Sequence, residues 1–382
     1  MVMGIKRTKL SDLLVFILSI LTIFFLWSNY AHLALFRCSN LTEAAKTGCW
    51  QGVLAKEVQR RGVNSSFEVL ARLYETEADF AESCHDFAHV IGEAAYAKYT
   101  NFGTIDFSEK AGYCGFGFYH GYIISMTAST QKLSEVKEFC SLANKTLSNS
   151  SGGVLLDCYH GIGHGVADYS LGDVSKATAK VLIDNSLAFC EEISENDNQL
   201  SRCSDGVYHA LTEVGVEAVA SHIKDDPTTF CLSQDINYQE ACFSSLGFLL
   251  MQLNGDNFGM AAGFSKEVGR FGAGFVRQLA GYQGYRTVDA IDHGYEIEVC
   301  RSLGGNLSKA CMMGLIEGMT DFGEPQEEHL STIDFCHESA FAEEEKDFCL
   351  NHAVGYFETY FGKERKKDAC RILQNSYNYQ CT

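Results

Sequence analysis

The stretch "CYHGIGHGVAD" contains three side chains that could bind a metal ion or move a proton. His160, His164 and Asp168 follow one another at intervals of four residues. Residues four apart lie on one face of a helix, so the two imidazoles and the carboxylate would form a single polar stripe. Side chains of these types at i and i+4 can bind one metal ion from a single helix, with neighbouring helices supplying the remaining ligands.

The same spacing and the same residue types recur along the chain. The further stripes are His85, His89 and Glu93 in "CHDFAHVIGEA", and Asp205, His209 and Glu213 in "CSDGVYHALTE". His120 occupies the equivalent position in "CGFGFYHG" without a carboxylate after it, and Glu317 with Asp321 repeats the carboxylate part in "CMMGLIEGMTD". A lone histidine on an apolar helix face is usually a hydrogen-bonded core residue, so it is the recurrence that favours ligands.

These residues predict a metal centre built from histidine and carboxylate ligands. The predicted metal ligands are His85, His89, His120, His160, His164 and His209, and the predicted catalytic carboxylates are Glu93, Asp168 and Glu213, with Glu317 as a further candidate. This ligand set suits Zn, Fe, Mn or Cu, and sequence does not choose among them. An open coordination position would make the site catalytic, through a metal-activated water or dioxygen. The alternative is a hydrogen-bonded or water-filled core network of the same side chains without a metal ion.

Glycines interrupt the stripe formed by His160, His164 and Asp168. Gly161, Gly163 and Gly165 would each destabilise a helix interior by roughly 1 kcal/mol relative to alanine. A gain elsewhere must offset that loss, and we expect close approach of neighbouring helices to supply it.

The 16 cysteines predict a framework of disulfides. They fall into eight consecutive pairs: 38/49, 84/114, 140/158, 190/203, 231/242, 300/311, 336/349 and 370/381. The short C-x(2-4)-C spacing of tetrahedral zinc sites is absent, so disulfides in an oxidising compartment are the better interpretation. The second cysteine of several pairs begins the pattern C-x-x-G-h-x-[His/Glu]-small, which indicates an internal repeat.

The interval between successive pairs suits two helices and a turn. Only two prolines occur, and strand-like alternation is scarce. The sequence therefore predicts an all-α fold of about eight αα-hairpins, stapled by disulfides and arranged as an α/α toroid or a compact solenoid.

The N-terminal residues are typical of a membrane-targeting segment. Residues 1–12 are basic and predicted to be cytoplasmic, 13–36 form a predicted transmembrane signal anchor, and 38–382 form the predicted extracytoplasmic domain. The uninterrupted apolar run is short for a bilayer, which needs about 20 residues, so a cleaved signal peptide is the alternative. Five sequons predict a glycoprotein: Asn40, Asn64, Asn144, Asn149 and Asn306.

The formal net charge of −19 argues against nucleic acid as a partner, because binding to a phosphate backbone needs clustered Lys and Arg. The only partner predicted is therefore the membrane, through the N-terminal segment. Two functions remain open. The first is a metal-dependent hydrolase or oxidase; the second is a helical-repeat module without metal that binds a protein, peptide or glycan. Convergence of the histidines would favour the first.

Overall fold

A computed structural model of the chain provides the structure. It describes residues 15–19, 30–77, 80–103, 105–106, 108–130, 133–147, 153–171, 179–213, 227–377 and 379–381. All regular secondary structure in these ranges is helical, which confirms the all-α prediction. Half of the predicted anchor at 13–36 and the sequon at Asn149 lie outside the described residues.

The helices are short to medium in length and follow one another closely. Their bounds are α2 Tyr30–Cys38, α3 Glu43–Arg61, α4 Val63–Thr76, α5 Cys84–Phe102, α6 Gly117–Thr130, α7 Leu133–Leu147, α8 Val154–Leu171, α9 Ala179–Ile193, α10 Asp197–Glu213, α12 Pro227–Leu232, α13 Gln239–Leu253, α14 Phe258–Gly263, α15 Gly272–Arg286, α16 Gly294–Leu303, α17 Gly305–Asp321, α18 Glu328–Cys336, α19 Glu343–Tyr356 and α20 Gly362–Tyr377. A π-helical turn, η5 (Phe357–Phe361), joins α19 to α20.

Local sequence signals set several of these helix ends. Gly62 ends α3 at φ 102°, and Gly103 ends α5 in the left-handed conformation at φ 70°. Glycine reaches positive φ without a steric penalty, so it is the usual residue at such ends. At the start of α14, the Asn257 side chain accepts a hydrogen bond from the Met260 N–H at 3.0 Å, which caps the first turn.

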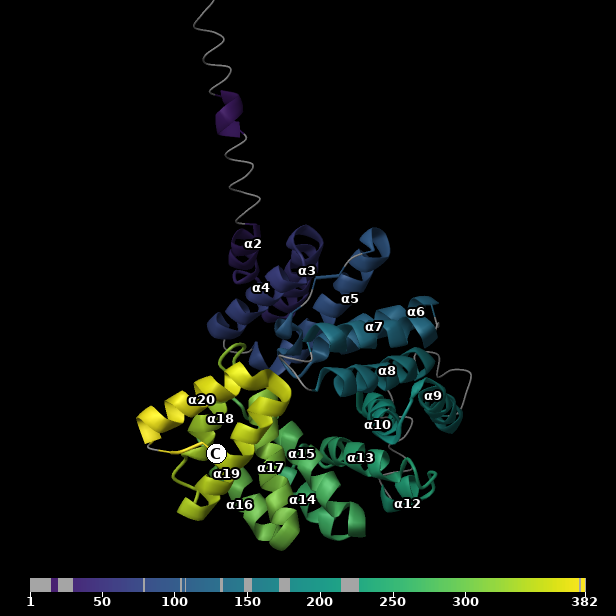
Figure 1. The fold of residues 1–382 in the computed structure, drawn as a ribbon, viewed down its shortest axis with the longest axis vertical. Coiled ribbons are helices and arrows are strands. Elements are labelled where there is room, and N and C mark those ends of the chain that lie inside the picture. The colour runs from purple at the N-terminus through teal and green to yellow at the C-terminus, as the bar shows by residue number, and fades with distance from the viewer. Residues whose placement is uncertain are drawn as a thin grey trace, which may run out of the picture.

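Successive helices pack against one another in one continuous path. The neighbours in contact are α5 with α6, α6 with α8, α8 with α10, α10 with α13, α13 with α15, α15 with α17, and α17 with α19. Figure 1 shows this path, with the colour advancing around the molecule from blue to yellow. Residues from all eight of these helices line one central pocket, and we call them the pocket helices.

The far end of the path contacts its beginning. The Tyr74 hydroxyl of α4 donates a hydrogen bond to the Phe322 carbonyl at 2.8 Å. The Gly115 N–H, just before α6, donates to the Asp321 carbonyl at 2.8 Å. These two bonds link residues that lie more than two hundred positions apart in the sequence.

Eight disulfides connect the cysteines in the predicted consecutive pairs, which confirms the disulfide framework. Five of them tie a pocket helix to the helix that precedes it: α7 to α8, α9 to α10, α12 to α13, α16 to α17 and α18 to α19. So many disulfides indicate an oxidising, extracytoplasmic environment. By restricting the unfolded chain, each contributes roughly 2–4 kcal/mol to stability in the chain-entropy account.

Glycines allow the pocket helices to touch backbone to backbone, as expected from the sequence. A Cβ atom on Gly163 of α8 would lie 1.8 Å from the Cys203 carbonyl oxygen of α10. On the other side of α8, a Cβ on Gly161 would lie 3.3 Å from the backbone of Tyr119 in α6. The central helix α8 is therefore held closely between two neighbours.

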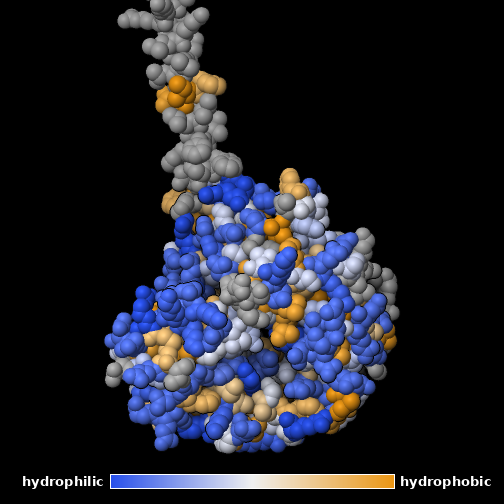
Figure 2. Space-filling model, viewed as in Figure 1, coloured by the Kyte–Doolittle hydropathy of each residue, from blue (hydrophilic) through white to orange (hydrophobic). Residues whose placement is uncertain are grey.

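One face of the molecule is largely polar (Figure 2). Figure 2 shows a mainly hydrophilic face that is hollowed near its centre. Within the described ranges, no helix combines the length and apolar character needed to cross a bilayer.

Replacing the glycine at the tightest crossing should destabilise the fold. We expect Gly163→Ala to lower the free energy of unfolding by roughly 3 kcal/mol, because the new methyl group forces α8 away from α10. Gly52→Ala in α3 is the matched control: apart from its own stretch of helix, no atom lies within 4 Å of its Cβ position, so we expect a gain of about 0.5–1 kcal/mol. Denaturant unfolding of both variants measures this. Equal effects of the two substitutions would contradict the close crossing.

Candidate metal centre

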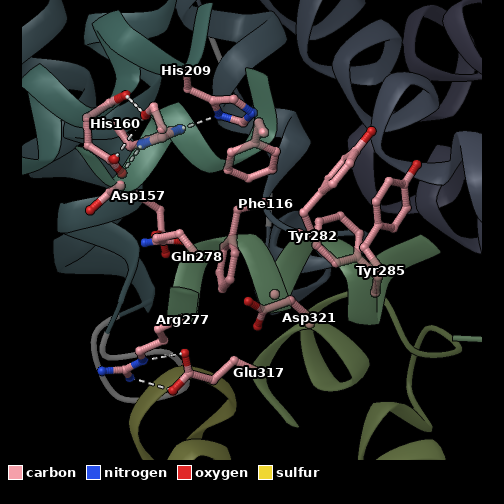
Figure 3. A pocket seen from close by; sticks show the side chains of 18 of the residues that line it. Phe116, Asp157, His160, His209, Arg277, Gln278, Tyr282, Tyr285, Glu317 and Asp321 are labelled. Atoms are coloured by element: carbon pink, nitrogen blue, oxygen red, sulfur yellow. Dashed lines mark hydrogen bonds and ion pairs between the residues drawn. The ribbon is translucent and has the colours of Figure 1, made fainter. Parts of the chain in front are cut away.

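One pocket of about 850 Å³ lies among the pocket helices. Its wall combines ionisable side chains with aromatic rings (Figure 3). Four of the six histidines predicted to bind metal line it, namely His85, His120, His160 and His209. The remaining two, His89 and His164, lie directly behind them in contact with lining histidines. All six therefore gather in one region of the fold.

The first histidine trio consists of His85 and His89 on α5 and His120 on α6. One ring nitrogen from each lies within 4.8 Å of the others, so the three residues could hold a metal ion. His89 Nε2 is 3.1 Å from His85 Nε2 and 3.2 Å from His120 Nδ1. Among the described residues, this is the group of three or more His, Cys, Asp or Glu with metal-ligand spacing.

Hydrogen bonds among the three ring nitrogens of the first trio leave one unfavourable contact. His85 Nδ1 lies 2.8 Å from the Cys114 carbonyl, which only accepts, so Nδ1 donates and Nε2 of a neutral His85 carries a lone pair. If His89 Nε2 carries a hydrogen, it can donate linearly to only one of its two neighbours. If it carries none, it faces the lone pair of His85. A cation placed among the three nitrogens removes this conflict.

A proton is a poor candidate for that cation. Burial lowers the pKa of His120 well below its ordinary value, and the neighbouring histidines lower it further when they are charged. His120 is 4% exposed, so water contributes little to stabilising an imidazolium. Neutral imidazole is the form that binds metals, and the site therefore favours that form.

The second histidine trio consists of His160 and His164 on α8 and His209 on α10. His160 Nε2 lies 3.1 Å from His209 Nδ1. His160 Nδ1 is 3.1 Å from Asp205 Oδ2, and His164 Nδ1 is 2.9 Å from Asp168 Oδ2. The stripe in "CYHGIGHGVAD" thus brings His164 and Asp168 into direct contact on one helix face.

The three carboxylates predicted to be catalytic have different surroundings. Asp168 contacts His164, and Glu93 is exposed on α5. Neither is among the described residues that line the pocket. Glu213 is the last residue of α10, and its side chain lies outside the described part of the structure. A catalytic role for these three residues stays a prediction.

The wall formed by α15, α17 and α19 carries a separate polar cluster. Arg277 Nε donates to Glu317 Oε2 at 2.8 Å, and its NH2 group bonds the other oxygen of the same carboxylate. His352 Nε2 lies 2.7 Å from Glu317 Oε1. Burial alone raises the pKa of Glu317, but the hydrogen bonds from His352 and Arg277 outweigh it and lower the pKa below its ordinary value. Glu317 is thus an ionised, fully engaged partner of Arg277.

The pKa of Asp321 is shifted in the opposite direction from that of Glu317, which lies one turn earlier on α17. The Tyr356 hydroxyl contacts both of its carboxylate oxygens, at 3.0 and 2.8 Å. Burial raises the pKa of Asp321 well above its ordinary range, although the Tyr356 hydrogen bond acts in the opposite direction. A protonated carboxyl group facing the pocket could act as a general acid.

Arg202 holds the carboxylates around the second trio, and sequence reasoning missed it together with Asp157. Its guanidinium donates to Asp205 Oδ2 at 2.8 Å and to Asp157 Oδ1 at 3.2 Å. Asp157 and Arg202 stand directly before Cys158 and Cys203. That shared position in the repeat was the available sequence signal.

The two aspartates bound to Arg202 have opposite pKa shifts. Burial alone raises the pKa of Asp205, but its hydrogen bond with His160 and the charges of His160 and Arg202 lower the pKa to about 2. For Asp157, burial prevails over Arg202 and raises the pKa to about 6. Asp157 is 7% exposed, and its Oδ2 atom is buried without a hydrogen-bond partner.

The charges of the pocket wall disfavour anionic substrates. The described lining carries six carboxylates (Asp86, Asp157, Asp205, Glu240, Glu317 and Asp321) and two guanidinium groups (Arg202 and Arg277). Both guanidinium groups already bind carboxylates of the same wall. Among the described lining residues, no guanidinium group is therefore left over to bind an anion.

The balance between burial and Arg202 at Asp157 can be measured directly. We expect the Asp157 carboxyl to titrate near pH 6, and near a higher pH in Arg202→Gln, because removal of the positive charge leaves burial unopposed. Carbon-13 NMR of aspartate-labelled protein, assigned with Asp157→Asn, gives both values. Titration near pH 4, as for an exposed aspartate, would contradict the burial of this group.

Comparisons with known proteins leave the function to be argued from this site. No protein-family model, no curated protein and no solved structure matches the chain. What the chain provides is a helical, disulfide-rich framework with a histidine trio that could hold a metal ion.

Proposed function

We propose that the protein is an extracytoplasmic metal-dependent enzyme, a hydrolase or an oxidase, whose active site is built on the first histidine trio. The observation that carries the proposal is the convergence of three ring nitrogens at metal-ligand spacing beside a large pocket. Three protein ligands leave a coordination position open for water or substrate, as in catalytic rather than structural zinc sites.

The pocket supplies what such a reaction needs beside the metal. A bound ion would activate a water molecule or dioxygen. The protein contributes ionisable groups: Asp157, with a pKa of about 6, and Asp321, with a pKa well above its ordinary range. Groups with shifted pKa values cluster at catalytic sites because they can exchange protons near neutral pH. This supports an enzyme over a passive binding surface.

The alternative, a binding module without metal, has less support. An open superhelix would leave the histidines in separate pairs on single helices, whereas nitrogens from α5 and α6 meet within hydrogen-bond distance. A concave binding face also does not require buried imidazoles with lowered pKa values. The pocket is enclosed by pocket helices from both ends of the path, which suits a small substrate.

The overall arrangement and the cellular location belong to the same proposal. The contacts of Tyr74 and Gly115 with residues at the C-terminal end of α17 support a closed α/α toroid rather than an open solenoid. The eight disulfides support placement of residues 38–382 outside the cytoplasm. We propose that 13–36 anchors this domain in the membrane, with the membrane as the partner of that segment and with no nucleic-acid partner.

Metal analysis tests the proposed function. We expect the full chain, purified in oxidised form and exposed to Zn²⁺, Mn²⁺, Fe²⁺ and Cu²⁺ separately, to retain at least one of these metals in stoichiometric amount. His89→Gln and His120→Gln should each lose one equivalent, because removal of a direct ligand weakens binding by more than the roughly 10–100-fold typical of an outer-shell residue. Elemental analysis after dialysis gives the content.

His337→Gln is the matched control for loss of a histidine, since His337 directly follows α18, stacked on Tyr377 and away from the pocket lining. It should keep the full metal content. Circular dichroism establishes that each variant is folded. Wild-type protein that retains none of the four metals would overturn the proposal and favour the binding module. Metal retained in both ligand variants would place the ion elsewhere and overturn the assigned site.

A further inference from the structure

We propose that the second histidine trio binds a second metal ion, so that the pocket contains a two-metal centre. The inference rests on the proposed function and extends it. The ligands are His160 and His164 of α8 and His209 of α10, with Asp205 and Asp168 as carboxylates that orient the imidazoles.

The helix pair α8 and α10 repeats the ligand arrangement of α5 and α6. In each pair the first helix supplies two histidines four residues apart, and the second helix supplies one. His120, His164 and His209 each stand six residues after a cysteine in the repeated pattern. The chain therefore presents the same three-imidazole unit twice.

Glycines bring the two helices together at the corresponding place in both pairs, three residues after the repeated cysteine. A Cβ on Gly117 of α6 would lie 2.6 Å from the His85 carbonyl of α5. A Cβ on Gly206 of α10 would lie 2.0 Å from the equivalent carbonyl, that of His160 in α8. In each pair, the close backbone approach is therefore beside a histidine, which brings imidazoles of both helices within reach of one ion.

The carboxylates fix which nitrogen of each α8 histidine is available to a metal ion. Asp205 Oδ2 accepts from His160 Nδ1 at 3.1 Å, and Asp168 Oδ2 lies 2.9 Å from His164 Nδ1. Nε2 is then the ligand atom of His160, and the nearby Asp168 carboxylate favours Nε2 as the ligand atom of His164. Metal-bound histidines nearly always have their second nitrogen bonded to a carboxylate or carbonyl in this way. His85 of the first trio shows the same feature, with Nδ1 bonded to the Cys114 carbonyl.

The imidazole rings of the second trio lie farther apart than those of the first. His160 Nε2 and His209 Nδ1 are 3.1 Å apart, but the ring centroids of His164 and His209 are 5.4 Å apart. A neutral hydrogen bond between His160 and His209 would satisfy that pair without metal. The third imidazole, His164, is 0% exposed and contacts Asp168. Binding of one ion by all three residues would require the rings of His164 and His209 to turn toward each other.

The two trios are close enough to act on one substrate. The His120 ring lies between them: its Nδ1 contacts His89, and its centroid is 5.0 Å from that of His164 and 5.1 Å from that of His160. Lining residues of both trios face the same pocket, as Figure 3 shows for His160 and His209 of the second. Paired metal ions in hydrolytic sites stabilise the attacking and the leaving oxygen together.

Zinc stoichiometry of the full, oxidised chain tests this inference. We expect two Zn²⁺ per chain in the wild type and one in each of the double variants His89→Gln/His120→Gln and His164→Gln/His209→Gln. The control His337→Gln should retain two. Mn²⁺ loaded in place of zinc should give a spin-coupled electron paramagnetic resonance signal that both double variants lose.

Asp205→Asn keeps the inference testable if the second double variant does not fold. This substitution removes no ligand but no longer orients His160. The zinc affinity of the second site, which we expect to be the weaker of the two, should therefore fall by roughly 10–100-fold, while the affinity of the first site is unchanged. One ion per chain, lost only with His89 and His120, would overturn the second site and leave the proposed function intact. One ion lost in both double variants would indicate a single site across the trios and also overturn it. No bound zinc, manganese, iron or copper would overturn both proposals.

Discussion

Backbone contact between neighbouring pocket helices is the constraint on which the rest of the structure depends. At Gly121, Gly163 and Gly206 a Cβ atom would lie within 2.0 Å of a carbonyl oxygen on the next helix. Any side chain there would push the helices apart. With the helices in contact, histidines on different helices reach hydrogen-bond distance. The glycines therefore determine whether the polar stripes form one site or several unrelated ones.

Burying so many ionisable groups requires each charge to be neutralised or suppressed. Arg202 and Arg277 are neutralised by carboxylates of the pocket wall, and His120 remains neutral because burial and its histidine neighbours lower its pKa. Asp157 and Asp321 respond by binding protons more readily. The low-dielectric surroundings that make unpaired charges costly are also what raises the pKa values of these two carboxyl groups.

The disulfides and the site are connected through the repeat. Each of Cys158 and Cys203 begins a motif that carries a histidine six residues later, and each ties its pocket helix to the preceding helix. The covalent tie limits how far the pocket helix can rotate or slide. Supports of this kind help to hold imidazole nitrogens of neighbouring helices about 3 Å apart, as for His89 with His120 and His160 with His209.

Sequence alone determined the features that depend on near neighbours. The helical class followed from the lack of strand-like alternation and of proline, the disulfide pairing from consecutive cysteines, and the stripes of His160, His164 and Asp168 from their spacing. Only the tertiary structure decided which histidines meet, because that depends on how each helix is rotated and how closely it crosses the next. The pairing of Arg202 with Asp157 and of Arg277 with Glu317 escaped prediction for the same reason. These partners lie at least 40 positions apart, and only packing brings such groups together.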